Sequence, residues 1–582
     1  MGLKRIVFLA LIISFLVSAS ASMQSRHYSV YQIRTSSNGI YGRLAIVIVM
    51  DAVNHSVLEE LMNEGKLPNI TSLVESGMYV IGRTIIPSAT TASWAALATG
   101  APPRINGVLH TYAINATHYH SILIDEEPQH LGYEDMIRAE SIIEVANEEG
   151  VKTGIVYSEK KVSVFFGATG VPSTSILMTE PYDAYSETLP IENRTEYTYN
   201  LTQKFIDIID MFYTSIKNGE RALLVLDYPE PDSSGHTHGP LSDYYKNMLE
   251  IIDGHIGRVV NHLKELGLWN RTLLIVMSDH SMIQVNREQN VMTEDGEHIM
   301  GLPVEHRAVG IGTLAYIYLK HTEQLDTAVD YLKRLSWVMG IWTREEISGV
   351  NGTLSDLDLD LPYGPDIVIS IREPYYASRY ENWGTHGGLN TIEIPIVISG
   401  GMLNTSKTLS NGSVRIIDIM PTMAGFLGMR MPKNATGRNL GIYMNFADVT
   451  MEVSPGIAEP GDTISISVSY RINVLKDEAK LRVVVESENK TYEEKEFAIY
   501  EDEGNKKTSI TLKDEGEYTI RAIVSAEGEL LGGAVSKILV VSLKVETPKA
   551  PIIGSIILSI VFGILIVISP VIVVKLRKRG IV

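Results

Sequence analysis

Leu44-Ala-Ile-Val-Ile-Val-Met50-Asp51 is an unbroken apolar run that ends in a carboxylate. A short run of this kind, without intervening polar residues, is typical of a strand buried on both faces of a parallel sheet. Four similar runs follow, separated by longer segments: Thr153–Tyr157, Ala222–Leu226, Leu273–Met277 and Ile394–Ser399. The alternation predicts an α/β domain with a largely parallel central sheet over residues 43–445.

Three of the connecting segments have the apolar spacing of amphipathic helices: Val57–Glu64, Glu196–Lys217 and Leu241–Leu266. Residues 285–380 interrupt this rhythm. There we expect a strand at Thr313–Leu319, a helix at Gln324–Val338 and a strand at Asp366–Ile371. The interruption indicates an inserted cap subdomain.

Beyond residue 446 the pattern changes to period-two alternation between turns rich in Gly, Pro and charged residues. The predicted strands are Met451–Val453, Thr463–Tyr470, Lys480–Ser487, Thr508–Leu512, Glu517–Val524 and Ala534–Lys544. They indicate an immunoglobulin-like β-sandwich over residues 447–545. We expect this domain to act as a stalk, with a ligand-binding module as the alternative.

The two ends of the chain predict export and anchoring. Residues 1–21 have a basic start, an apolar middle and the small-residue exit Ala19-Ser20-Ala21, as in a cleaved signal peptide. Residues 552–574 are uncharged and long enough for one transmembrane helix. The basic tail at 575–582 predicts a cytoplasmic C-terminus. We therefore expect a single-pass cell-membrane protein whose catalytic domain is extracellular.

Eleven Asn-x-Ser/Thr sequons support the extracellular placement and indicate a glycoprotein. They begin at Asn54, Asn69, Asn115, Asn193, Asn200, Asn270, Asn351, Asn404, Asn411, Asn434 and Asn489.

The composition excludes several classes of function. The 582 residues carry a formal net charge of −19 and no cysteine. An acidic chain approaches polyanions against its own field, so we expect no nucleic-acid-binding surface. Without cysteine, disulfides, thiol catalysis and iron–sulfur clusters are excluded. Any metal ion must be held by His, Asp, Glu or a hydroxyl group.

Six carboxylates and imidazoles lie beside the ends of the predicted strands: Asp51, Asp232, His236, Asp279, His280 and His386. Because strand-to-helix loops gather at one edge of an open parallel sheet, we expect these side chains to meet there. Singly, each could be a helix cap or a packed histidine. Jointly they predict a site for two divalent cations per chain, with Zn²⁺ as the expected metal and Mn²⁺ or Co²⁺ as alternatives.

Hydroxyl groups stand just before a short Ala-rich helix in Pro87-Ser-Ala-Thr90-Thr91. A helix N-terminus offers free N–H groups and a positive dipole end, which suit an anionic phosphoryl group. Next to two cations such a hydroxyl is a candidate nucleophile, because a metal can hold it as an alkoxide near neutral pH. The alternative role of Thr90 or Thr91 is a helix N-cap.

The stretch Pro231-Asp-Ser-Ser-Gly-His-Thr-His-Gly-Pro240 resembles the metal motif of the nucleotide pyrophosphatase/phosphodiesterase family in the alkaline phosphatase superfamily. Four further motifs stand in the family's order: the strand ending in Asp51, the threonine motif ending in Thr99-Gly100, Ser278-Asp279-His280 and Gly384-Thr385-His386-Gly387. The resemblance covers about residues 43–445. It implies an alkaline-phosphatase-like sandwich around the largely parallel sheet.

The resemblance also implies roles for individual residues. One cation would be held by Asp232, His236 and His386, and the other by Asp51, Asp279 and His280. Thr90 would ligate the second cation and act as the nucleophile. It stands ten residues before Gly100, as in the family motif.

Two positions depart from the family pattern. Ser93 replaces the usual Asn three residues after the nucleophile, and we expect its hydroxyl to serve as the oxyanion donor. Thr91 replaces the usual Phe that stacks on a nucleotide base, which weakens the case for nucleotide substrates.

These observations predict a surface-anchored phosphodiesterase or pyrophosphatase that works through a phosphothreonine. Its substrate would be a small-molecule, lipid or glycan phosphodiester. The alternatives are a phosphomonoesterase or phosphotransferase on the same scaffold, and an inactive surface or adhesion glycoprotein. A sulfatase is disfavoured, because the nucleophile motif lacks the Cys-x-Pro-x-Arg pattern and the chain has no cysteine to be converted.

Overall fold

Leu44–Met50 forms strand β1 of a seven-stranded sheet with the order β2-β16-β8-β1-β7-β5-β6. Its neighbours in this sheet are β2 (Met78–Arg83), β16 (Glu393–Ser399), β8 (Thr272–Met277), β7 (Ala222–Tyr228), β5 (Lys152–Tyr157) and β6 (Ser175–Thr179). β1 pairs in parallel with both β7 and β8, whereas β16 runs antiparallel to β8 and β2. The prediction of a largely parallel sheet is confirmed, with β2 and β6 as additions.

The structure is a computed structural model that describes residues 42–121, 129–157, 175–179, 191–217, 219–444, 446–473, 479–487, 490–526 and 529–540. The predicted signal peptide, the predicted transmembrane helix at 552–574, the basic tail and Asn489 lie outside these ranges. Within them, every helix is either too short or too polar to cross a bilayer.

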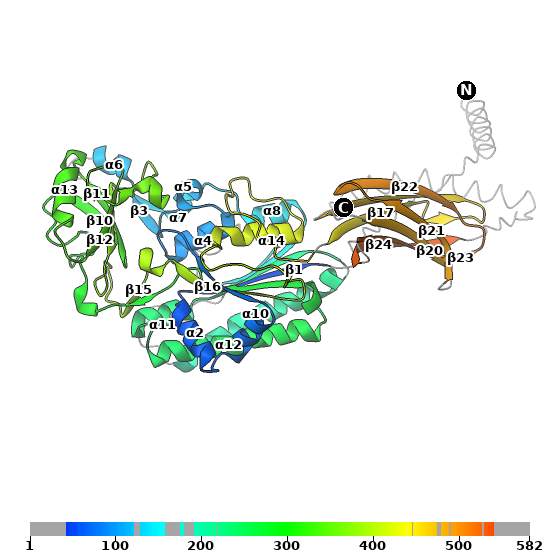
Figure 1. Ribbon diagram of the computed structural model, residues 1–582, viewed down its shortest axis with the longest axis horizontal. Helices are drawn as coiled ribbons and strands as arrows, with labels where there is room; N and C mark the ends of the chain where they lie inside the picture. Colours follow the sequence, from blue (N-terminus) through cyan, green and yellow to red (C-terminus); the bar gives the residue numbers. More distant parts are fainter. Residues whose placement is uncertain are drawn as a thin grey trace, which may run out of the picture.

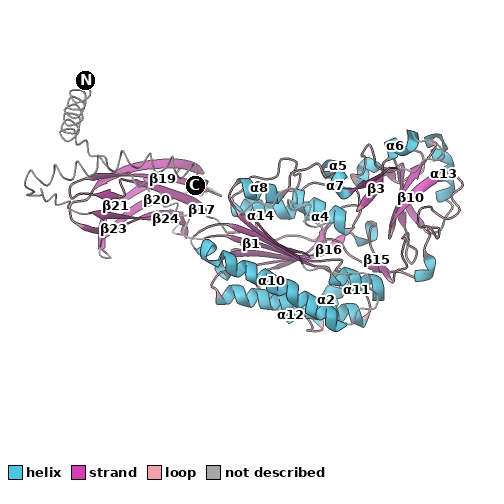
Figure 2. Ribbon diagram, turned by 180° about the vertical axis from the view of Figure 1, so that it is seen from behind, coloured by secondary structure: helices cyan, strands magenta, loops and turns pink. Residues whose placement is uncertain are grey.

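The unbroken apolar character of β1 follows from helices on both faces of the sheet (Figures 1 and 2). One face is covered by α2 (His55–Asn63), α3 (Pro68–Glu75), α10 (Ile191–Lys217) and α12 (Asp243–Glu265). The other face is covered by α4 (Thr90–Thr99), α8 (Ile142–Glu148) and α14 (Ile419–Leu427). Val47 packs in the same core as Trp94 of α4, and Ile48 in the same core as Ile252 of α12. Strand residues therefore enter two cores alternately.

Several short elements complete the α/β domain. They are α5 (Pro103–Asn106), β3 (Tyr112–Ile114), α6 (Ala116–Ser121), β4 (His130–Gly132), α7 (Tyr133–Met136), α11 (Glu230–His238), β9 (Ile283–Gln284) and β15 (Gly384–Thr385). β3 pairs with β4, and β9 with β15.

A separate five-stranded sheet lies between residues 306 and 371, in the order β10-β11-β14-β12-β13. Its elements are β10 (His306–Ile311), β11 (Leu314–Leu319), α13 (Leu325–Leu332), β12 (Val338–Thr343), β13 (Gly352–Thr353) and β14 (Ile367–Ile371). It stands apart from the central sheet at one end of the molecule (Figure 1).

The helix predicted over Gln324–Val338 is too long, because α13 ends at Leu332. Val338 instead begins β12, which is rich in β-branched and aromatic residues and pairs antiparallel with β14. Residues 333–337 form turns, so the predicted helix is wrong over these residues, and strand pairing determines the conformation only from Val338 onward.

The C-terminal part is a sandwich of a three-stranded and a five-stranded sheet. The first contains β17 (Ala447–Ser454), β19 (Thr463–Ile472) and β22 (Glu503–Thr511), and the second contains β18 (Ile457–Ala458), β24 (Glu529–Val540), β23 (Gly516–Ala526), β20 (Lys480–Ser487) and β21 (Lys490–Ala498). β21 was not predicted, because it is an edge strand rich in charged residues and lacks a clean apolar alternation.

Arg43 joins the sandwich to the α/β domain. Its side chain is buried, and Nη2 donates to Asp448 Oδ1 at 2.7 Å and to the Leu427 carbonyl at 3.1 Å. The guanidinium also lies 3.8 Å from the ring centre of Phe446. Burial lowers the pKa of Arg43, and the Asp448 carboxylate opposes that shift. The junction is thus a paired buried charge at the edge of the sheet where β1 begins.

Candidate metal centre

The six predicted ligands come together at the edge of the sheet where β1, β7 and β8 end. Asp51 directly follows β1, and Asp279 and His280 follow β8. His386 follows β15 and precedes β16. Because β16 is antiparallel to its neighbour, its beginning lies at the edge where the parallel strands end. The geometry of the mixed sheet explains why a residue before a strand joins residues that follow strands.

Asp232 and His236 lie on helix α11 (Glu230–His238), where the sequence analysis placed a loop. Pro231 stands in the first turn, where its missing N–H costs no helical hydrogen bond. The spacing of four residues brings Asp232 and His236 to the same face of the helix. The local conformation therefore aims one carboxylate and one imidazole at the same point.

The first ligand set is compact. Asp232 Oδ1 lies 3.3 Å from His236 Nε2 and 3.6 Å from His386 Nε2. One donor atom from each of these three residues lies within 4.8 Å of the other two.

The second ligand set adjoins the first and shares Asp232 with it. His280 Nε2 lies 3.2 Å from Asp51 Oδ1, and the donor atoms of Asp51, Asp232 and His280 lie within 4.8 Å of one another. Asp279 Oδ2 lies 3.6 Å from the same His280 nitrogen. Asp279 Oδ1 accepts the N–H groups of Ala52 and His280, so Oδ2 is the oxygen on the side of the cluster.

Backbone carbonyls orient all three imidazoles. Nδ1 lies 2.8 Å from the Gly384 carbonyl in His236, 3.1 Å from the Ser281 carbonyl in His280 and 3.1 Å from the Ser88 carbonyl in His386. A carbonyl only accepts, so Nδ1 carries the proton and Nε2 of a neutral ring keeps its lone pair. This is the outer hydrogen bond that fixes the tautomer of metal-binding histidines.

Burial and neighbouring charges together shift the pKa values of several groups in the cluster. Burial alone would raise the pKa of Asp232, but the imidazoles of His236, His386 and His280 lower it overall. Burial lowers the pKa of His386 well below its usual value, and the charge of His280 acts in the same direction. Burial raises the pKa of Asp279.

The donor set fits divalent cations. Among the described residues, Asp232 Oδ1 and Asp279 Oδ2 are buried carboxylate oxygens that accept no hydrogen bond. A buried oxygen without a donor is costly, and a cation between carboxylates and imidazole nitrogens removes that cost. Mixed nitrogen and oxygen ligands suit zinc and related ions.

Thr90 is the first residue of α4 and lies against the second ligand set. Its Oγ is 3.1 Å from His280 Nε2 and 3.5 Å from each carboxylate oxygen of Asp51. The N-cap of α4 is Ala89, so neither Thr90 nor Thr91 occupies the N-cap position.

The hydroxyl of Ser93 is fully buried and lies 2.9 Å from Thr84 Oγ. The role of Ser93 as oxyanion donor stays a prediction. Among the described residues its hydroxyl hydrogen-bonds to Thr84 and not to a member of the cluster. Beside Thr90, Thr91 Oγ lies 2.8 Å from Thr111 Oγ. Thr111 belongs to none of the sequence motifs, and only the fold brings it next to the threonine motif.

Fold and site together define an α/β protein with a candidate two-cation centre beside a hydroxyl. Residues 45–391 match the family model described as type I phosphodiesterase / nucleotide pyrophosphatase, and the chain belongs to this family. The resemblance drawn from five motifs is thereby confirmed.

Several relatives match part of the chain. Human ectonucleotide pyrophosphatase/phosphodiesterase family member 1 is 27% identical over 221 residues, which are 38% of this chain and 22% of the human protein. Bis(5'-adenosyl)-triphosphatase ENPP4 of Bos taurus is 40% identical over 233 residues, which are 38% of this chain and 48% of the bovine protein. The chain thus spans less than half the length of these curated relatives.

Among solved structures, the chain is similar to an inactive variant of murine ectonucleotide pyrophosphatase/phosphodiesterase 5 in complex with AMP. The TM-score is 0.49 and the identity 17%, over 67% of this chain and 96% of the murine chain.

Proposed function

We propose that the protein is a metal-dependent hydrolase that cleaves phosphodiester or pyrophosphate bonds through a phosphothreonine on Thr90. The observation that carries this proposal is the position of the Thr90 hydroxyl, 3.1 Å from His280 Nε2 at the end of a cluster of buried carboxylates and imidazoles. Family membership gives the reaction class, and the geometry supports the choice of nucleophile.

Asp232, His236 and His386 would hold one cation, and Asp51, Asp279 and His280 the other, with Asp232 facing both. Bound there, two divalent cations would lower the pKa of a hydroxyl and neutralise charge that develops on phosphoryl oxygens. We propose Zn²⁺, because three imidazoles and three carboxylates suit it.

The chain's own groups then carry the reaction. Thr90 Oγ bonds to phosphorus as the bond to the leaving alcohol breaks, and water on the vacated side later breaks the Thr90–phosphorus bond. The first N–H groups of α4 have no partner within the helix, so they can donate to phosphoryl oxygens beside Thr90. Thr90 starts the helix and therefore stands where these donors converge.

We also propose that the protein works at the cell surface, on the strength of the signal-like residues 1–21 and the apolar residues 552–574. Thr91 has no aromatic ring on which a nucleotide base could stack. Its side chain is also 1% exposed and hydrogen-bonded to Thr111, so it is not available to a ligand. We therefore propose that small-molecule, lipid and glycan phosphodiesters are better candidates than nucleotides.

A test of the function compares bis(p-nitrophenyl) phosphate with p-nitrophenyl phosphate as substrates for the purified protein. We expect faster hydrolysis of the diester, its loss with a chelator and its return with Zn²⁺. Preference for the monoester would instead show a phosphomonoesterase. Less than one zinc ion per chain together with no hydrolysis of either ester would favour an inactive surface or adhesion glycoprotein.

A further inference from the structure

A second candidate site lies at the opposite edge of the central sheet, between the α/β domain and the sandwich. It is a cavity of about 750 Å³, within the range of small-molecule sites. Arg221 lines it directly before β7 begins, whereas Asp232 of the metal centre follows the other end of that strand. The seven residues of β7 therefore separate the two places by about 23 Å at about 3.3 Å per residue.

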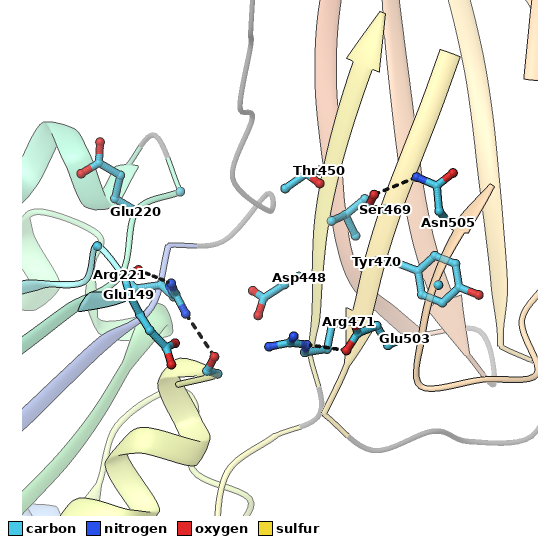
Figure 3. A pocket seen from close by; sticks show the side chains of 15 residues that line it. Glu149, Glu220, Arg221, Asp448, Thr450, Ser469, Tyr470, Arg471, Glu503 and Asn505 are labelled. Atoms are coloured by element: carbon cyan, nitrogen blue, oxygen red, sulfur yellow. Dashed lines mark hydrogen bonds and ion pairs between the residues drawn. The ribbon is translucent and has the colours of Figure 1, made fainter. Parts of the chain in front are cut away.

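The sandwich wall of the cavity consists of two polar rows across β17, β19 and β22 (Figure 3). Strand register aligns Thr450, Ser469 and Asn505 in the first row. The same register aligns Asp448, Arg471 and Glu503 in the second. Asn505 Nδ2 donates to Ser469 Oγ at 2.8 Å, and Arg471 Nε lies 3.1 Å from Glu503 Oε2. These side chains form an ordered array of donors and acceptors.

The opposite wall comes from turns of the α/β domain, and its shape is fixed by Arg221. The guanidinium donates to the carbonyls of Leu427 and Gly428 with Nη1 and to the Glu149 carbonyl with Nη2. Arg221 is thus occupied in holding three backbone segments together. The carboxylates of Glu149 and Glu220 lie on the same wall (Figure 3).

The charges of the lining select against phosphate and other anions. Four carboxylates (Glu149, Glu220, Asp448 and Glu503) face two guanidinium groups. Three of the carboxylates are paired with cations: Asp448 with Arg43, Glu220 with Lys152 and Glu503 with Arg471. Arg221 donates to backbone carbonyls. An anionic ligand would therefore have to compete with carboxylates or carbonyls for every one of these cations. Among the described residues, the groups close enough to hold a cation are those of the metal centre, and none of these four carboxylates is among them.

An apolar ligand is disfavoured as well. The two larger apolar residues of the lining, Val449 and Tyr470, are 1% and 4% exposed, so they offer little surface. What remains is hydroxyl, carboxamide, carboxylate and guanidinium groups. Sugar hydroxyls both donate and accept, and so do the side chains of Thr450, Ser469 and Asn505.

We propose that this cavity binds a neutral oligosaccharide. The row Thr450–Ser469–Asn505 would bond successive sugar hydroxyls, and the carboxylates would accept hydrogen bonds from adjacent hydroxyl pairs. The ligand would contact both domains at once.

The proposal is tested with the full-length protein on an array of neutral, uronic-acid and sulfated oligosaccharides, followed by titration with the best neutral binder. We expect binding to neutral members only. Asn505→Ala should weaken it about three- to tenfold, the effect of one or two lost hydrogen bonds. Ser465→Ala, on the same face of β19 but outside the cavity, is the matched control and should leave affinity unchanged.

Two results would overturn the proposal: no binding of any neutral oligosaccharide, or equal affinities in the Asn505→Ala and Ser465→Ala variants. The thermal melting of each variant checks that the sandwich is folded. Because binding is measured without hydrolysis, the result is independent of the catalytic proposal, and Thr90→Ala should bind the oligosaccharide normally.

Discussion

The hydroxyl oxygen of Thr90 and Nε2 of His280 lie 3.1 Å apart, although 190 residues separate them along the chain. Thr90 begins a helix on one face of the central sheet, and His280 follows a strand of that sheet. The contact brings the start of a helix and the end of a strand into the same candidate site.

Thr90→Ala should lower hydrolysis of bis(p-nitrophenyl) phosphate by at least about a thousandfold, because it removes the attacking oxygen. Metal content should stay close to that of the unaltered protein, since the six carboxylate and imidazole ligands remain. Thr90→Ser restores a hydroxyl and should recover part of the activity. Substantial turnover by the alanine variant would remove Thr90 from the mechanism.

Asp232→Asn should reduce the content of both metal ions, because Asp232 belongs to both ligand sets. His236→Gln removes a ligand from the first set alone and should chiefly affect one ion. His238→Gln is the matched control on the same helix, where its ring stacks on Tyr244 with a centroid distance of 4.0 Å. Metal analysis of the purified variants distinguishes these outcomes, and equal loss from His236→Gln and His238→Gln would contradict the assignment.

Glu140→Gln should destabilise the fold at neutral pH by about 1–2 kcal/mol, the range for a charged hydrogen bond to a partly exposed partner. Arg430 binds both carboxylate oxygens of Glu140, at 2.7 and 2.8 Å, and this bond lowers the pKa of Glu140 to about 2. Because the pKa of Glu140 is lower in the folded state, its ionised carboxylate stabilises the fold at pH values above the ordinary pKa of 4.5. This stabilisation is lost as the pH falls toward 2.

The difference in unfolding free energy between Glu140→Gln and the unaltered protein should therefore shrink below pH 4.5. Urea denaturation at pH 7, 5 and 3.5 measures it. Glu148→Gln, which removes a more exposed partner of Arg430, is the control and should cost less. A difference that is constant over this range would refute the role of the Glu140 carboxylate.

Glycosylation should occur at Asn434 and not at Asn69 when the protein is made in a glycosylating host. The glycan attaches to Nδ2, and Nδ2 of Asn69 donates to Asp253 Oδ2 at 2.8 Å. Asp253 is 1% exposed, so a glycan on Asn69 would break a partly buried bond. Asn434 is exposed. Glycopeptide mass spectrometry decides the matter, and full occupancy of Asn69 would show that this bond does not form.

The elements that the sequence predicted well are those whose residues carry an unambiguous local pattern. β1, β7 and β8 are buried on both faces and appear in the sequence as unbroken apolar runs. β12 was not predicted, and its first residue, Val338, was placed at the end of the preceding helix. Its strand conformation depends on pairing with β14, which lies more than twenty residues further along the chain. β21 escaped notice for another reason, since an edge strand tolerates many charged residues.

The sequence predicted which side chains gather at the candidate site, but only part of how they are placed relative to one another. Strand endings and motif spacing indicated that six candidate ligands and Thr90 lie close together, and the structure brings these side chains together. The shared position of Asp232, the helical conformation around it and the hydroxyl pair Thr91–Thr111 depend on packing between distant segments. No local pattern encodes such contacts.

The placement of the ligands on separate loops, from Asp51 to His386, affects when the centre can come into being. In an unfolded chain only the pairs Asp232–His236 and Asp279–His280 are close in sequence, so it would bind a cation much more weakly than the complete set. Firm binding of the proposed cations would therefore require that these loops have already come together. If the chain is exported, as proposed above, and is still unfolded at that point, it would take its metals from the surroundings into which it emerges rather than from the compartment where it was made.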